Sequence, residues 1–208
     1  MFTGLITDIG EVRAAEGGKF QIACGYGLGE EHIGSSIACN GCCLTVTNIQ
    51  AGPGSFVSLF WVDVSNETLA RTTLGAWAPG AKVNLERSLT PSGELGGHMV
   101  TGHVDAVASI VSRDADGDSV RFEIQVDDAL AKFIAAKGSV ALNGVSLTVN
   151  EVAGARFTVN LIPHTLTHTT WGELGRGDNI NLEVDLLARY VARIMETRNQ
   201  KDAPRERG

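Results

Sequence analysis

Short segments in which apolar and polar residues alternate recur along most of the chain. Clear examples lie at residues 20–24 (Phe-Gln-Ile-Ala-Cys), 44–49 (Leu-Thr-Val-Thr-Asn-Ile) and 121–126 (Arg-Phe-Glu-Ile-Gln-Val). When apolar and polar residues alternate with a period of two residues, successive side chains point to opposite faces. This pattern predicts β-strands. The 25 glycines are spread among these segments, as tight turns between short strands require. The pattern therefore predicts an all-β fold.

The residues after 185 follow a different pattern, with apolar side chains three and four positions apart. This spacing predicts an amphipathic α-helix at residues 186–200. The apolar stripe consists of Leu186, Leu187, Tyr190, Val191, Ile194 and Met195. Asp185 is well placed to cap the helix, which we expect either to pack on a barrel or to join subunits. Shorter helical segments are predicted at residues 65–71 and 164–169, and a fuller one at 127–136.

The chain also contains an internal repeat. Asn-Gly-Cys-Cys-Leu-Thr-Val at 40–46 recurs as Asn-Gly-Val-Ser-Leu-Thr-Val at 143–149. Phe-Thr-Gly at the start of the chain similarly matches Val-Thr-Gly at 100–102, and Val-Asn-Leu-Glu at 83–86 matches Ile-Asn-Leu-Glu at 180–183. Because the matches occur in the same order in both halves, the chain contains two copies of one fold. We place the copies at residues 1–88 and 97–185.

Each copy contains about six strand-like segments, which would leave costly open edges in a flat sheet. Closure into a small barrel removes those edges, and a sandwich is the alternative. We therefore expect two six-stranded barrels in tandem, followed by the helix at 186–200.

Charge and composition restrict the partners. A formal charge of -7 and a pI near 5.2 argue against nucleic acid or a membrane surface, since both require a concentrated basic face. The chain has no apolar run of about 18 residues and opens without a signal-peptide pattern, so we expect a cytoplasmic protein. The cysteines all lie in the first quarter of the chain and are expected to be reduced. A zinc site would need the distant His98 and His103 as well, and we expect no metal.

The repeated Asn-Gly motifs bring polar side chains to one end of each barrel and imply two related sites, although a turn alone would explain their repetition. The copies differ, because Cys43 corresponds to Ser146, and Lys137 stands where the first copy has Gly34. Such differences suit an enzyme that treats two copies of one ligand differently, and sequence drift in a purely structural duplication would look the same.

His103 follows a repeated Thr-Gly and is favoured over His98 as a ligand-facing histidine. Motifs for nucleotide cofactors are missing, since no G-x-G-x-x-G or Walker-A sequence occurs.

Together these motifs resemble the riboflavin synthase family over about residues 1–200. The resemblance rests on the opening Met-Phe-Thr-Gly, Asn-Gly-Cys-Cys-Leu-Thr-Val-Thr at 40–47, Gly-Gly-His-Met-Val-Thr-Gly-His-Val at 96–104, the second Asn-Gly motif and Leu-Ile-Pro-His-Thr-Leu at 161–166. It implies two Greek-key barrels, a C-terminal helix that organises a homotrimer, and an active site between one subunit's N-terminal barrel and a neighbour's C-terminal barrel. The implied reaction transfers a four-carbon unit between two molecules of 6,7-dimethyl-8-ribityllumazine. It yields riboflavin and 5-amino-6-(D-ribitylamino)uracil, without a cofactor, as the final step of riboflavin biosynthesis.

The resemblance also implies the site residues. For the first pocket they are Gly4, Leu5, Ile6, Cys43, Leu44, Thr45, Asp63, Val64, Ser65, Asn66, Glu67 and Thr68. For the second pocket they are Gly102, His103, Val104, Lys137, Ser146, Leu147, Thr148, Asn160, Leu161, Ile162, Pro163, His164 and Thr165. The implied catalytic groups are Cys43, His103, Ser146, Thr148 and Asp185.

Two positions depart from the family pattern: residues 61–66 lack the usual Met-Lys segment, and His164 stands where Glu is common. Two other functions remain open. One is a non-catalytic lumazine- or flavin-binding antenna that keeps only one working pocket, and the other is a flavoprotein reductase barrel, which would need a nucleotide-binding partner domain.

Overall fold

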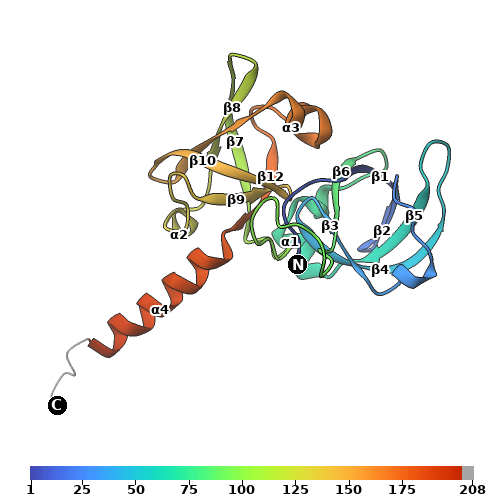
Figure 1. Cartoon of the computed structure of the whole chain (residues 1–208), viewed down its shortest axis with the longest axis horizontal. Helices are drawn as coiled ribbons and strands as arrows, with labels where there is room; N and C mark the ends of the chain where they lie inside the picture. Colours follow the sequence, from blue (N-terminus) through green and yellow to red (C-terminus); the bar gives the residue numbers. More distant parts are fainter. Residues whose placement is uncertain (203–208) are drawn as a thin grey trace.

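The computed structural model describes residues 1–202, with side chains described through residue 198. Two closed barrels of six antiparallel strands lie side by side (Figure 1). The first contains β1 (Asp8–Glu16), β2 (Lys19–Cys24), β3 (Ser36–Cys39), β4 (Cys42–Ala51), β5 (Ser58–Asp63) and β6 (Lys82–Arg87). The second contains β7 (Ala106–Asp116), β8 (Ser119–Gln125), β9 (Ser139–Leu142), β10 (Val145–Ala153), β11 (Arg156–Leu161) and β12 (Asn179–Val184).

Both barrels have the same topology. The first closes in the order β1-β2-β5-β4-β3-β6, and the second closes in the corresponding order of β7 to β12. The second strand of each barrel pairs with the fifth instead of the third, which is a Greek-key arrangement. The predicted fold, two tandem barrels of duplicated sequence with a C-terminal helix, is confirmed.

Apolar side chains fill the interior of each barrel. Phe60 and Leu74 belong to the first core, and Phe122 and Trp171 to the second. Phe122 and Trp171 pack edge to face with ring centroids 4.9 Å apart. Because the barrels are filled, a ligand has to bind outside the strands.

The short helices lie mostly where the sequence predicts them. They are α1 (Asn66–Arg71), α2 (Asp128–Ala131), α3 (Pro163–His168) and the 3₁₀ segments η1 (Glu30–His32), η2 (Thr73–Ala76) and η3 (Thr170–Gly172). The predicted helix at 127–136 is wrong in length. After Ala131 the chain continues in three-residue turns, with Phe133 N–H bonding to the Leu130 carbonyl, and these turns place Ile134 in the core.

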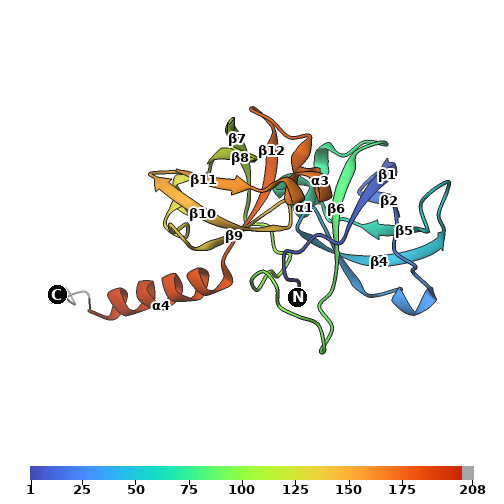
Figure 2. The same ribbon diagram turned by 45° about the horizontal axis from the view of Figure 1, so that its top comes forward.

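The C-terminal helix α4 (Leu186–Asp202) extends away from both barrels, as Figures 1 and 2 show. Asp185 Oδ1 accepts the Leu187 N–H at 2.8 Å and caps the helix, as predicted. An ion pair between Arg189 and Asp105 holds its first turn to the second barrel. None of the helices in residues 1–202 is long and apolar enough to cross a membrane.

The two barrels meet along a line of equivalent residues. Phe2 and Val100, which correspond in the repeat, form an antiparallel bridge with N–H to carbonyl distances of 2.7 and 3.1 Å. Next to it the two Asn-Gly turns lie back to back, so that a Cβ on Gly41 would come within 2.7 Å of Gly144 N. Residues that are equivalent in the internal repeat therefore meet one another in the contact between the barrels.

Candidate functional site

Two pockets of about 270 Å³ lie on the outside of the barrels, one beside each Asn-Gly turn. The Cys43 pocket is lined by Cys42, Cys43, Glu67, Thr68, Arg71, Thr72, Gly102, His103 and Val104. The Ser146 pocket is lined by Gly4, Leu5, Ile6, Val145, Ser146, His164, Thr165, His168 and Thr169. Every lining residue of one pocket corresponds to a lining residue of the other in the repeat, so these are two versions of one site.

Each pocket combines residues from both copies of the repeat. The Gly4 carbonyl accepts the Ser146 N–H at 2.8 Å, and the Gly102 carbonyl accepts the Cys43 N–H at 2.9 Å. Residues 4–6 therefore line the pocket of the second barrel, and residues 102–104 line the pocket of the first. The expected grouping, which kept residues 4–6 with Cys43 and residues 102–104 with Ser146, is wrong. The opening segment of each copy crosses over at the Phe2–Val100 bridge, and position in the repeat does not reveal this crossing.

The close approach at these crossings requires glycine. Gly4 and Gly102 have φ angles of 76° and 80°, in the left-handed region that side chains rarely adopt. A Cβ on Gly4 would lie 2.5 Å from Ser146 Cβ, and one on Gly102 would lie 2.5 Å from Cys43 Cβ. The two Thr-Gly pairs are thus conformational requirements of the pockets.

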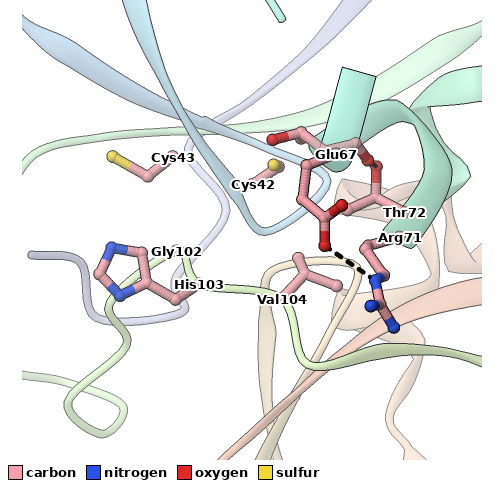
Figure 3. Close-up of a pocket in the computed structure, with 9 residues that line it drawn as sticks. Cys42, Cys43, Glu67, Arg71, Thr72, Gly102, His103 and Val104 are labelled. Carbon is pink, nitrogen blue, oxygen red and sulfur yellow. Dashed lines mark hydrogen bonds and ion pairs between the residues drawn. The ribbon is translucent and has the colours of Figure 1, made fainter. Parts of the chain in front are cut away.

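The Cys43 pocket brings a thiol, an imidazole and an ion pair together. Figure 3 shows the Cys43 thiol and the His103 ring on one side, and Glu67 with Arg71 on the other. Glu67 accepts from Arg71 Nε at 3.0 Å across one turn of α1. Cys43 is the only partly exposed cysteine, whereas Cys42 is buried and desolvation raises its pKa to about 12. Of these neighbouring thiols only Cys43 is suited to react.

The Ser146 pocket pairs a hydroxyl with a different histidine. Ser146 Oγ and His98 Nδ1 lie 2.7 Å apart. Burial lowers the pKa of His98 below its usual 6.5, and the negative charge of Asp185 partly opposes this effect. At neutral pH His98 is therefore uncharged and its ring can accept the Ser146 proton. At the rim, His164 stacks on His168 with ring centroids 4.1 Å apart.

Side chains along β4 and β10 point alternately into the barrel and outward, which decides which of the predicted residues can present a side chain to a ligand. Leu44 and Leu147 are buried in the barrel cores, so only their backbone groups can meet a ligand. Thr45 and Thr148 are exposed on the same face as Cys43 and Ser146, two positions along the strand. They lie next to the pockets and not in their linings.

Other predicted residues have structural roles or lie elsewhere. Ser65 caps α1 by accepting the Thr68 N–H at 3.2 Å, and Asn160 donates to Asp116 at 2.9 Å. Asn66 lines a separate hollow with Leu69 and Trp77. The remaining predicted residues outside both linings are Asp63, Val64, Lys137, Leu161, Ile162 and Pro163.

Several lining residues were missed by reasoning from the sequence. Arg71 with Thr72 and His168 with Thr169 end equivalent helices in the two copies, and they match in the repeat. That correspondence was a usable signal, because residues beside α1 and α3 line both pockets. The contact of His98 with Ser146 was also not predicted, because the sequence favours His103 as the ligand-facing histidine. A regular strand would turn one of the two away, but residues 98–103 form a loop with only a single bridge at Val100.

A family model described as Lumazine binding domain matches this chain twice, over residues 3–88 and 101–185. The riboflavin synthase of Brucella abortus (strain 2308) is 50% identical over 200 residues, covering 94% of this chain and 98% of that protein. The riboflavin synthase of Photobacterium phosphoreum is 40% identical over 200 residues, covering 94% and 89%. The riboflavin synthase of Bacillus subtilis (strain 168) is 37% identical over 204 residues, covering 96% and 92%.

The fold is similar to that of a protein solved as LumP complexed with 6,7-dimethyl-8-(1'-D-ribityl) lumazine. The TM-score is 0.71 at 22% identity, with 88% of this chain and 99% of that chain covered. At this identity the likeness concerns the arrangement of the two barrels alone.

Proposed function

The chain belongs to the riboflavin synthase family, whose lumazine-binding domain it contains twice, and we propose that the Cys43 and Ser146 pockets are where its reaction takes place. The enzyme is a transferase. It passes a four-carbon unit between two molecules of 6,7-dimethyl-8-ribityllumazine and forms riboflavin and 5-amino-6-(D-ribitylamino)uracil.

One observation carries this assignment of the site: the pockets are alike in volume and in the repeat positions that line them, and different in reactive groups. Both enclose about 270 Å³ beside an Asn-Gly turn, but one is lined by Cys43 and His103, and the other is lined by Ser146, whose hydroxyl contacts His98. A reaction between two identical substrates needs two similar binding surfaces. It also needs an asymmetry, because one substrate gives up carbon and the other gains it.

The reaction is balanced between its two substrates. The carbon unit lost by one lumazine is gained by the other, so the donor's and acceptor's changes in oxidation state cancel and no external oxidant is required. Holding the two rings face to face replaces a bimolecular encounter, which is worth up to about 7 to 11 kcal/mol. Positioning is therefore the main contribution that we assign to the protein.

Proton transfer is the second contribution. The 7-methyl group of the substrate is acidic because its anion delocalises into the ring, so a base of ordinary strength can remove the proton. The Ser146 hydroxyl, bonded to a neutral His98, is placed for this exchange, with Asp185 contributing its charge. Cys43 and His103 form the counterpart in the other pocket, and the exposed Thr148 can hold a water next to Ser146.

We further propose a homotrimer built on α4, with two lumazines in each active site. Leu187, Tyr190, Val191, Ile194 and Met195 are all more than half exposed along one side of this helix, which contacts little of its own chain (Figure 2). Such a stripe is typical of a helix that packs against other copies. The Cys43 pocket of one subunit would then face the Ser146 pocket of a neighbour. In this proposal residues 1–88 and 97–185 are the lumazine-binding units and residues 186–200 the oligomerisation helix.

A cytoplasmic location agrees with the state of the thiols. Cys24, Cys39, Cys42 and Cys43 are all free, and three of them are buried. Reducing compartments keep cysteines in this form.

Incubation of the purified protein with 6,7-dimethyl-8-ribityllumazine alone tests the activity, with absorbance and chromatography to follow both compounds. We expect one riboflavin for every two lumazines consumed, without added metal or nicotinamide. Tight binding with no turnover would instead indicate a non-catalytic lumazine carrier.

A further inference from the structure

Two carboxylates are buried in the contact between the barrels and form no salt bridge with the described residues. Burial raises the pKa of one of them, Glu86, and the charge of the N-terminal ammonium partly opposes this rise. Glu86 on β6 is 5% exposed and Glu183 on β12 is 3% exposed. Burying an unpaired charge is costly unless hydrogen bonds replace its water. The two residues correspond in the repeat, so the same cost is met twice in this fold.

Both carboxylates are satisfied by the segments that open each copy. Glu86 accepts the Thr3 N–H at 2.6 Å, the Thr3 hydroxyl at 2.7 Å and the Gly4 N–H at 2.9 Å. Glu183 accepts the Thr101 N–H and hydroxyl, both at 2.7 Å, the Gly102 N–H at 2.9 Å and the His103 N–H at 3.0 Å. Hydrogen bonds to an ionised acceptor are roughly twice as strong as neutral ones, so these segments are held firmly.

Each clamped segment continues into the pocket of the other barrel. Beyond the Glu86 clamp, the Gly4 carbonyl accepts from Ser146, and beyond the Glu183 clamp, the Gly102 carbonyl accepts from Cys43. A peptide that donates to an anion on one side becomes a better acceptor on the other, because chained hydrogen bonds polarise one another.

We propose that Glu86 and Glu183 are positioning residues that act across the barrels. Glu86, from the first barrel, sets the geometry of the Ser146 pocket, and Glu183, from the second barrel, sets the geometry of the Cys43 pocket and of His103. The proposal rests on the proposed function in one respect, namely that these pockets are where substrate binds.

Cys43 provides a reporter that needs no substrate. It is the only cysteine that is not buried, and desolvation raises the pKa of Cys24 to about 11 and of Cys42 to about 12, so a thiol reagent should modify Cys43 first. The rate of alkylation by iodoacetamide then measures the geometry of the Cys43 pocket. In a C43S/S146C chain the same reagent reports on the Ser146 pocket.

We expect Glu183→Gln to change the alkylation rate of Cys43 by about fivefold or more, because the amide cannot accept all four bonds. Glu86→Gln is the matched control and should leave that rate as in the parent chain. In the C43S/S146C background the two effects should exchange. A change confined to the barrel that contains the substituted glutamate, or equal changes in both pockets, would overturn the proposal.

A second pair of variants covers the case in which a glutamine variant does not fold. Thr101→Val removes only the hydroxyl donor to Glu183, and Thr101→Ser restores it; Thr3→Val and Thr3→Ser do the same for Glu86. The valine variants should show the same crossed pattern at smaller size, and the serine variants should recover. Because alkylation is measured without lumazine, a protein that fails to make riboflavin but shows crossed alkylation would contradict the proposed function and not the clamp.

Discussion

Asn84 on β6 and Asn181 on β12 correspond in the repeat, and each places its side-chain amide on the backbone of the opposite barrel. Asn84 Nδ2 donates to the Asn143 carbonyl at 3.0 Å, and Asn181 Nδ2 donates to the Asn40 carbonyl at 2.9 Å. Both side chains are buried. The reciprocal bonds fix the barrels to one another, and pockets that draw residues from both barrels depend on that arrangement.

We expect Asn84→Ala to lower the free energy of unfolding by about 1 to 3 kcal/mol, because it leaves buried backbone groups unpaired. These are the Asn143 carbonyl and the N–H of Thr170, which donates to Asn84 Oδ1 at 2.8 Å. Urea unfolding followed by circular dichroism gives the value. Asn179, which is exposed at the start of β12, supplies the control, and its alanine variant should stay within about 0.5 kcal/mol of the parent. Equal losses in both variants would contradict the assignment.

Gly102→Ala and Gly4→Ala should each reduce turnover at least about tenfold, since a Cβ at either position enters the space of Cys43 or Ser146 and displaces a pocket wall. Steady-state rates of riboflavin formation measure the effect. Gly117→Ala is the matched control, because Gly117 has a φ of 60° with nothing near its Cβ position. It incurs backbone strain of about 1 to 2 kcal/mol without the clash and should retain the parent rate. A parent-like rate in Gly102→Ala would show that the contact with Cys43 is unimportant.

The pairing of His98 with Ser146 predicts the acid side of the pH–rate profile. Burial lowers the pKa of His98, so it stays neutral down to a pH below 6.5 and its ability to accept a proton is lost as pH falls through the shifted pKa. The free energy of unfolding falls over the same range. The folded state favours neutral His98, so this histidine costs no stability above pH 6.5, but the protein loses stability as pH falls from 6.5 through the shifted pKa. We expect kcat to fall over this range. Asp185→Asn removes a charge that raises the His98 pKa and should move the acid limb to lower pH.

Replacing His98 itself tests its chemical role. His98→Asn should lower kcat by about 10² to 10⁴ with a smaller change in KM, as for loss of a general base. His32, which lies in η1 and contacts Gly29 and Arg87 instead of a pocket residue, provides the comparison, and His32→Asn should keep the parent kcat. A His98→Asn enzyme with normal kcat and an unchanged acid limb would exclude His98 from proton transfer.

The exposed stripe of α4 predicts how assembly can be broken. Ile194, at 66% exposure, is more exposed than Leu187, Tyr190, Val191 and Met195, and Ile194→Asp should convert the proposed trimer to monomers by placing a charge in an apolar contact. Arg193, on the polar side, gives the control variant Arg193→Ala, which should remain trimeric. Sedimentation equilibrium distinguishes these states. A parent chain that sediments as a monomer would contradict the trimer directly, and an Ile194→Asp trimer would contradict the role of the stripe.

Local pattern in the sequence was sufficient for most of the fold. Alternation identified the strands because one face of each meets a filled core, and the duplicated motifs identified two equivalent barrels. Asn40 and Asn143 adopt φ angles of 45° and 46°, as the hairpin turns that Asn-Gly favours require. The helix predicted at 127–136 failed because burial of Ile134 in the core bends the chain after Ala131.

The composition of each pocket was decided by tertiary structure. Two barrels, a terminal helix and the equivalence of Cys43 and Ser146 could be predicted from the sequence, because periodicity and repetition can be read along the chain without knowing its contacts. Which residues meet across the barrels depends on the bridge between Phe2 and Val100, 98 positions apart in the chain, and on the carboxylates that hold the crossing segments. Hydrogen bonds between distant segments leave no periodic trace, so the crossing of residues 4–6 and 102–104 and the contact of His98 with Ser146 could be seen only in three dimensions.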